Sequence, residues 1–227
     1  MRYFYSIVAC LCLSLSTFSL AAQDRDDTFM IWSTTTINKP LGQDKKWSVG
    51  LHSEYRHQFH EGESKTSQYF VRPNVSYKAL PWLSLKYQVD FAFTPSGFRM
   101  RFIPEVSFTK KTGDFSLSLR QRALTTWKIA EGTNSTVLRT RARVEYSIPE
   151  TPMSVHCAVE PYWCDFSKTS FAWLQKVRWY AGVNIKLTDG LTLTPQYVCQ
   201  AYHNHKGVYD RRTYDDHVFY MTFAVKL

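Results

Sequence analysis

The stretch from Leu138 to Ile148 alternates strictly between two kinds of residue. Read as a β-strand, in which successive side chains point to opposite faces, it presents one apolar face and one charged face. The charged face carries Arg139, Arg141, Arg143 and Glu145. An apolar face suits lipid or a protein core, but a soluble β-sandwich could expose the charged face to water. The fold class therefore depends on whether this pattern recurs along the chain.

The same alternation recurs in eleven segments of roughly ten residues, the length of a tilted strand that crosses a bilayer. In the clearest segment every odd position from 83 to 93 is apolar, whereas the even positions are Ser, Lys, Gln, Asp and Ala. A helix would scatter both sets around its circumference. The predicted strands cover residues 29–37, 47–59, 68–78, 83–93, 98–108, 115–127, 138–148, 153–163, 176–187, 191–201 and 219–227.

Three features favour a membrane barrel over a secreted β-sandwich, which is the alternative. Aromatic residues of the apolar faces lie near the segment ends, as in the interfacial girdles of outer-membrane barrels. Short connections such as Leu80-Pro81 alternate with longer ones such as His203 to Asp215. The chain ends on an amphipathic strand, Phe219 to Leu227. The sequence therefore predicts an all-β fold, an antiparallel up-and-down transmembrane β-barrel.

The number of strands in the wall does not follow directly from these segments. Single-chain bacterial barrels have an even number of strands, so that both chain ends lie on one side of the membrane. Eleven segments would break this rule. We therefore expect a wall of ten or twelve strands. The miscounted strand should lie before Trp47, where the segment from Phe29 to Ile37 is the least regular.

The first 22 residues have the features of a secretory signal peptide. The apolar run from Ile7 to Leu20 is short for a membrane-spanning helix, follows Arg2, and leads to Ala21-Ala22 before a charged segment. We expect cleavage after Ala21 or Ala22. The predicted organisation is a signal peptide over residues 1–22 and an outer-membrane β-barrel over residues 23–227.

Composition narrows the classes of function. The chain has 227 residues, 16% of them aromatic, and a mean hydropathy of −0.33, which argues against a bundle of apolar helices and against disorder. The arginines behind the formal charge of +9 follow strand parity rather than forming one cluster, so no nucleic-acid partner is expected. Cys157, Cys164 and Cys199 are odd in number and lack metal-ligand spacing, so we expect neither a disulfide framework nor a metal or cofactor.

Several motifs together resemble an uncharacterised family of bacterial outer-membrane barrels, the domain of unknown function 2490. They are the signal peptide, an early Trp32, the Glu54-Tyr55-Arg56 triplet, the alternating arginines and the amphipathic carboxyl-terminal strand. The alternating arginines form the motifs Arg99-x-Arg101, Arg120-x-Arg122 and Arg139-x-Arg141-x-Arg143. The resemblance covers essentially the mature chain. It implies the barrel fold and the outer-membrane location, and it brings no catalytic residue with it.

If the polar faces point inward, charged side chains line the interior of the barrel, which we call the lumen. Positive charge is in excess, and Lys86 and Lys176 add to it. One expectation is a filled, structural barrel whose carboxylates are paired with guanidinium groups. The other is a narrow pore that favours small anions. The predicted lumen charge network comprises Glu54, Arg56, Arg72, Asp90, Arg99, Arg101, Glu105, Arg120, Arg122, Arg139, Arg141, Arg143, Glu145, Glu160 and Arg178.

An outer-membrane enzyme of the lipase, acyltransferase or protease type is the alternative function. Such a site needs a nucleophile or an activated water with a base in reach. No nucleophile motif is present, so no residue is assigned a catalytic role. The residues considered for this chemistry are His203, His205, Asp210, Asp215, Asp216 and His217 near the last loop, and His52 and His156 in the lumen.

The expected partners follow from location. Membrane lipids contact the apolar exterior, and lipopolysaccharide could contact the basic loop residues Lys168, Lys206, Arg211 and Arg212. The barrel-assembly machinery would recognise the carboxyl-terminal strand, as the resemblance to outer-membrane barrels implies. Small anions are the expected molecules in the lumen.

Overall fold

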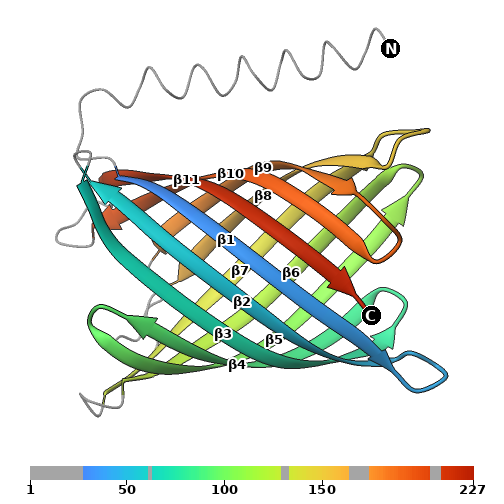
Figure 1. The fold of residues 1–227 in the computed structure, drawn as a ribbon, viewed down its shortest axis with the longest axis horizontal. Helices are drawn as coiled ribbons and strands as arrows, with labels where there is room; N and C mark the ends of the chain where they lie inside the picture. Colours follow the sequence, from blue (N-terminus) through green and yellow to red (C-terminus); the bar gives the residue numbers. More distant parts are fainter. Residues whose placement is uncertain (1–27, 61–62, 129–132, 164–173, 205–210) are drawn as a thin grey trace, which may run out of the picture.

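The computed structural model shows a closed barrel of eleven tilted strands (Figure 1). It describes residues 28–60, 63–128, 133–163, 174–204 and 211–227; the side chains of residues 28, 60, 63–66, 128, 133–134, 203–204 and 211–215 lie outside the description. The strands are β1 (Thr28–Leu41), β2 (Trp47–His60), β3 (Glu63–Leu80), β4 (Leu83–Thr94), β5 (Gly97–Thr112), β6 (Phe115–Lys128), β7 (Thr133–Ser147), β8 (Met153–Trp163), β9 (Leu174–Lys186), β10 (Leu191–Asn204) and β11 (Arg211–Lys226).

The prediction of ten or twelve strands is wrong, because β1 is part of the wall. Each strand pairs with its chain neighbours in antiparallel fashion, and β1 pairs with β11 in parallel, from Thr28 opposite Asp216 to Asn38 opposite Lys226. When an odd number of strands alternates in direction, the first and the last run the same way. The closing pair must then be parallel, and the even-number rule gave no warning of this exception.

The side chains alternate between lumen and exterior as the pattern predicts. In β8 the even positions from Ser154 to Tyr162 are all buried, whereas the odd positions are exposed or half-buried. In β4 the buried residues Gln88, Asp90 and Ala92 likewise alternate with more exposed apolar ones. Residues 1–22, the predicted signal peptide, lie outside the described residues.

Five prolines lie within strands; Pro40 is the next-to-last residue of β1, and each of the other four coincides with a gap in the pairing to one neighbouring strand. Pro73 lies in a gap between β3 and β4, Pro104 between β5 and β6, Pro161 between β7 and β8, and Pro195 between β9 and β10. Proline has no N–H to donate to such a ladder. The pairing on the other side of each proline is retained, so the sheet stays closed.

The two ends of the barrel differ in their connections. At one end, which we call the short-turn end, lie the turns at residues 42–46, 81–82, 113–114, 148–152 and 187–190, together with the carboxyl terminus. Backbone bonds fix this end: Leu227 N–H donates to Asn38 O at 2.9 Å, and Lys226 N–H donates to Gly190 O at 2.8 Å. The opposite end holds the connections after β2, β4, β6, β8 and β10; those after β2 and β4 span only residues 61–62 and 95–96, but the longest connections, after β8 and β10, lie here, so we call it the long-loop end.

Gly182 in β9 leaves room for two side chains to meet inside the lumen. A Cβ atom there would lie 2.5 Å from Gln196 Cβ, 2.8 Å from His156 Cε1 and 2.9 Å from Pro195 O. His156 Nε2 and Gln196 Oε1 are 3.3 Å apart, and both side chains are buried. This close contact explains why a glycine faces inward here.

We predict that Gly182→Ala lowers the free energy of unfolding by about 1–3 kcal/mol, because the added methyl group overpacks this contact. Urea unfolding of the detergent-folded barrel, followed by tryptophan fluorescence, measures the change. Ala181→Val is the matched control, because residue 181 points to the exterior. An unchanged unfolding midpoint in Gly182→Ala would contradict the close packing.

Candidate functional site

The lumen contains a central cavity of about 300 Å³ with a strong excess of positive charge. Of the side chains that the structure describes around it, ten are lysine or arginine and two are carboxylates, Glu54 and Asp90. Strands β2 to β7 and β9 supply the cations, because the charged residue of each alternating pair faces inward. The cations are Arg56, Arg72, Lys86, Arg101, Arg120, Arg122, Arg139, Arg141, Lys176 and Arg178.

One group of ion pairs surrounds Glu54 and Asp90. Glu54 contacts Arg56, and its Oε2 lies 2.6 Å from Arg72 Nη1. Asp90 contacts Arg101, and its Oδ1 lies 3.1 Å from Arg72 Nε. The guanidinium groups of all three arginines also lie over the ring of the buried Phe70, at 4.6 to 4.9 Å from its centroid. Cation–π contact and ion pairing therefore fix the same side chains.

A second group surrounds Glu160, which is fully buried. Its Oε1 lies 2.8 Å from Arg120 Nη2, and its Oε2 lies 2.7 Å from Arg139 Nη2. The Tyr180 hydroxyl donates to Oε2 at 2.6 Å. Glu160 thus joins strands β6, β7, β8 and β9 through one carboxylate. Glu105 contacts Arg122 in a smaller pair beside it.

Five residues of the predicted network do not line the central cavity: Glu105 and Glu160 contact arginines that do, whereas Arg99, Arg143 and Glu145 lie apart from it. Arg143 Nη2 is 2.7 Å from Glu145 Oε2, and the Ser154 hydroxyl donates to the same carboxylate at 2.7 Å. Arg99 Nη2 donates to Ser96 Oγ at 2.6 Å, in the turn between β4 and β5. These residues do not line the central cavity.

Four cations of the central cavity have no carboxylate within 4.0 Å among the described residues: Lys86, Arg141, Lys176 and Arg178. Aromatic rings take the place of carboxylates for three of them. Arg141 lies 4.1 Å from the Tyr180 centroid, and Arg178 and Lys176 lie 4.8 and 4.7 Å from the Tyr162 centroid. The site therefore has cations whose charge no described carboxylate neutralises directly.

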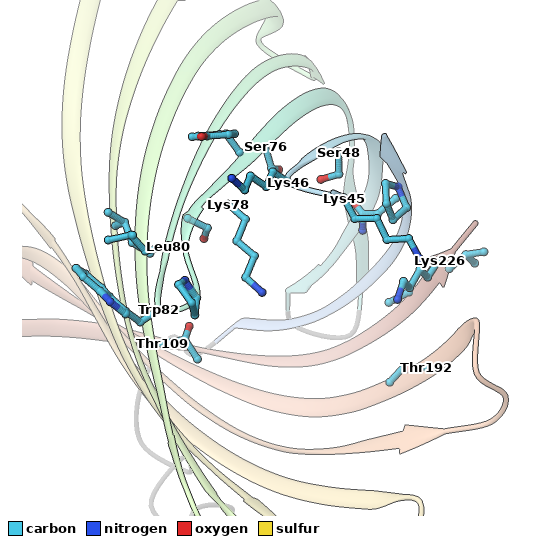
Figure 2. A pocket seen from close by; sticks show the side chains of 18 of the residues that line it. Lys45, Lys46, Ser48, Ser76, Lys78, Leu80, Trp82, Thr109, Thr192 and Lys226 are labelled. Atoms are coloured by element: carbon cyan, nitrogen blue, oxygen red, sulfur yellow. The ribbon is translucent and has the colours of Figure 1, made fainter. Parts of the chain in front are cut away.

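A second cavity of about 550 Å³ forms the mouth of the barrel at the short-turn end. Figure 2 shows Lys78 extending into this opening, with Lys226 on the side opposite Trp82. Lys45 and Lys46, from the turn after β1, complete a group of four lysines. The nearby acid Asp189 contacts Lys186 Nζ at 2.7 Å, and this hydrogen bond lowers the pKa of its carboxyl group. The mouth therefore continues the positive charge of the lumen.

Several lumen residues were missing from the predicted network. Trp32, Phe70 and Gln200 are buried there, and Asp216 lies in β11 rather than in the preceding loop. Strand parity could have placed both Phe70 and Asp216 inward. Phe70 lies two residues from Arg72, which was assigned to the inner face, and Asp216 lies three residues from Phe219, which is exposed on the outer face. No sequence signal indicates which aromatic ring each arginine contacts.

Among the histidines whose side chains the structure describes, His52 comes nearest to a catalytic contact. His52 Nδ1 lies 3.1 Å from Thr36 Oγ1, and its Nε2 lies 3.2 Å from Glu54 Oε2, which looks like a relay. However, Nε2 also lies 2.7 Å from Arg72 Nη1, and a guanidinium can only donate. In the neutral ring Nδ1 therefore carries the proton and donates to Thr36, so His52 cannot take a proton from that hydroxyl.

The last-loop residues do not gather in the described part of the chain. Asp216 is buried in the lumen, whereas the next residue, His217, contacts the Tyr197 hydroxyl. Adjacent strand residues point to opposite faces, so these two cannot act together. The side chains of His203, His205, Asp210 and Asp215 lie outside the described residues.

Metal sites and membrane helices are absent from the part of the chain that the structure describes. Those residues include no group of three or more His, Cys, Asp or Glu side chains that could hold a metal ion. No helix among them is long and apolar enough to cross a membrane.

Comparison with known proteins gives a match to a family model and matches to solved structures. A family model described as "Protein of unknown function (DUF2490)" matches residues 29–211. A solved structure described as NanC porin in a rhombohedral crystal form is 12% identical, with a TM-score of 0.48, and the match covers 86% of this chain and 98% of that chain. No curated protein matches the chain.

We predict that Glu160→Gln lowers the free energy of unfolding by about 3–5 kcal/mol, because it leaves Arg120 and Arg139 without their buried partner. Glu145→Gln is the matched control on the neighbouring strand. Because the ion pair of Glu145 with Arg143 is partly exposed, this variant should lower the free energy of unfolding by less than about 1 kcal/mol. Urea titration of both variants measures the difference. Equal losses would show that Glu160 does not hold the barrel together.

Proposed function

The chain belongs to the family described as "Protein of unknown function (DUF2490)", and we propose that it is an outer-membrane barrel whose lumen is a narrow, anion-favouring pore. The proposal keeps the signal peptide at residues 1–22 and export of the barrel at residues 23–227. It has two parts, location and permeation, and they rest on different features of the barrel.

The apolar exterior supports a membrane location. Large apolar side chains are exposed on every strand except β10, including Trp47, Tyr69, Phe115 and Trp179, which are 45–54% exposed. A soluble protein rarely exposes contiguous apolar surface of this extent. A closed barrel also satisfies its backbone hydrogen bonds internally, as a spanning segment in lipid requires.

The central cavity supports the anion-favouring pore, and it is the observation that carries the proposal. Its ten cations face two lining carboxylates, and four of the cations have no carboxylate partner among the described residues. A narrow lumen of one charge sign raises the local concentration of the opposite ion. The four lysines at the short-turn mouth extend this potential to the opening.

A filled, structural barrel is the competing function. The ion pairs around Glu54, Asp90 and Glu160 do occupy part of the lumen. A salt-bridged plug, however, would leave neither a central cavity nor a surplus of unpaired cations. For the enzyme alternative, no contact among the described residues favours catalysis.

The proposed location also names the partners. The exposed apolar residues of β11, Phe219 and Phe223, would face lipid and give the assembly machinery its amphipathic strand. Lipopolysaccharide would contact the long-loop end through Lys168, Lys206, Arg211 and Arg212, whose side chains lie outside the described residues.

We predict that the protein fractionates with the outer membrane and migrates faster on a denaturing gel before heating than after it. Closed barrels resist detergent until they are heated, because every strand is paired on both sides. Membrane fractionation followed by paired boiled and unboiled samples tests this. A chain that stays soluble without detergent would overturn the membrane location.

We predict that the purified barrel conducts ions in a planar bilayer and that its reversal potential in a salt gradient shows anion preference. Arg141→Glu should lower the anion-to-cation permeability ratio by about threefold or more, because it reverses a lumen charge that has no carboxylate partner among the described residues. Lys110→Glu is the matched control; it makes the same charge change outside the lumen, where Lys110 lines an apolar groove with Leu117 and Leu119. Absent conductance or cation preference would refute the pore.

A further inference from the structure

We propose that the lumen contains a specific binding site for a carboxylate or phosphate group, formed by Arg178, Lys176 and Trp32. These residues, together with Arg56, line both the central cavity and a smaller neighbouring cavity of about 230 Å³, which is distinct from the mouth. We call this place the junction. The inference deepens the proposed function and rests on it, because it names the chemical group that the positive lumen would select.

Arg178 is a buried cation whose neighbouring carboxylates are already bound. It is 5% exposed and lies opposite Glu160 in the β8–β9 register, but Glu160 contacts Arg120 and Arg139 instead. No carboxylate lies within 4.0 Å of Arg178 among the described residues. A buried charge without a partner is costly, so a bound anion would stabilise it.

Gln200 holds Arg178 in place without neutralising it. Arg178 Nε donates to Gln200 Oε1 at 2.5 Å, and Gln200 Nε2 donates to Asp216 Oδ2 at 2.6 Å. Gln200 and Asp216 are 1% and 2% exposed, so the order Asp216–Gln200–Arg178 is fixed. The amide separates the acid from the guanidinium. The positive charge of Arg178 is therefore not offset by a carboxylate in direct contact, and its terminal nitrogens remain for another acceptor.

Two further donors at the junction have no described acceptor. Lys176 has no carboxylate partner among the described residues, and its Nζ lies over the rings of Tyr162 and Tyr202 at 4.7 and 5.1 Å. Trp32 is 2% exposed, and its Nε1 is buried with no hydrogen-bond partner in the described structure. An unsatisfied buried N–H costs free energy comparable to a lost hydrogen bond. A ligand that accepts hydrogen bonds would remove this cost.

The rings fix the geometry of the cations. The guanidinium carbons of Arg56 and Arg178 lie 4.1 and 4.8 Å from the Trp32 centroid, and the Trp32 and Tyr220 rings pack edge to face. A guanidinium held in one orientation binds oxygen pairs better than a mobile one, because less side-chain entropy is lost.

These donors define the ligand class. A guanidinium, an ammonium and an indole N–H all donate, so the ligand must supply several acceptor lone pairs and negative charge. Carboxylate and phosphate groups do so, and they match the planar guanidinium. The adjoining cavities of about 300 and 230 Å³ limit the ligand to a small molecule.

The test is isothermal titration of the full, detergent-folded barrel at fixed chloride with sodium phosphate, sodium malonate and malonamide. Phosphate and malonate should bind, and malonamide should not, because it keeps the shape of malonate without its charge. Arg178→Gln should weaken binding by at least about tenfold, and Trp32→Phe, which keeps a ring but removes the N–H, by about threefold.

The matched control is Arg141→Gln, which removes one unpaired arginine from the same cavity but not from the junction. Arg141→Gln should change the affinity for phosphate and malonate by less than about threefold, because Arg141 acts on the ligand only through its electrostatic field from outside the junction. Equal losses in Arg178→Gln and Arg141→Gln, or binding of malonamide as tight as that of malonate, would overturn the site. Unboiled gel migration establishes that each variant is folded, and Trp32→Phe gives a second reading if Arg178→Gln is not.

Binding and conductance separate this inference from the proposed function. Anion-selective conductance without saturable binding of phosphate or malonate would leave the pore and refute the junction site. Saturable binding that depends on Arg178 in a barrel without conductance would refute the pore and keep the site.

Discussion

The parallel pairing of β1 with β11 is the contact on which the rest of the barrel depends. Without it, a sheet with an apolar outer face would expose two open edges, and no lumen would exist. The same pairing assembles the junction. Trp32 and Arg56 come from β1 and β2, whereas Lys176 and Arg178 come from β9. Gln200 and Asp216, from β10 and β11, hold Arg178 on its own side of this seam, and the Arg178 guanidinium crosses the seam to lie 4.8 Å from the Trp32 centroid. The first and last strands therefore build the candidate site as well as the wall.

The charge of the lumen is held by two different kinds of contact. Carboxylates neutralise six of the ten cations around the central cavity, and a few acids serve several strands at once, as Glu160 does. Aromatic rings hold three of the others, because a ring face attracts a cation without cancelling its charge. Buried arginines can then keep both a fixed position and a positive field. This combination explains how a densely charged interior remains ordered and still attracts anions.

Much of the architecture could be predicted from the sequence, because the alternation of side chains is a local property. Strand positions, the two faces and the inward placement of Arg120, Arg139 and Glu160 all follow from parity. The strand count could not be obtained this way, since closure is a property of the whole sheet and the even-number rule pointed the wrong way. The partner of each charge was equally inaccessible. Arg178 lies opposite Glu160 in register, yet it bonds to Gln200, because reach and competition decide among neighbours.

The choice of an amide at position 200 distinguishes a binding site from a salt bridge. A carboxylate in direct contact with Arg178 would satisfy the guanidinium within the protein, as Glu54 does for Arg72. Gln200 lies between Asp216 and Arg178 and hydrogen-bonds to both. It fixes the position of the arginine but keeps the negative charge of Asp216 away from it. The same interior thus contains arginines that hold the strands together and arginines whose charge is kept available. The ion-paired group supplies the rigid frame, and the ring-supported cations at the junction supply the charge that an anion would meet.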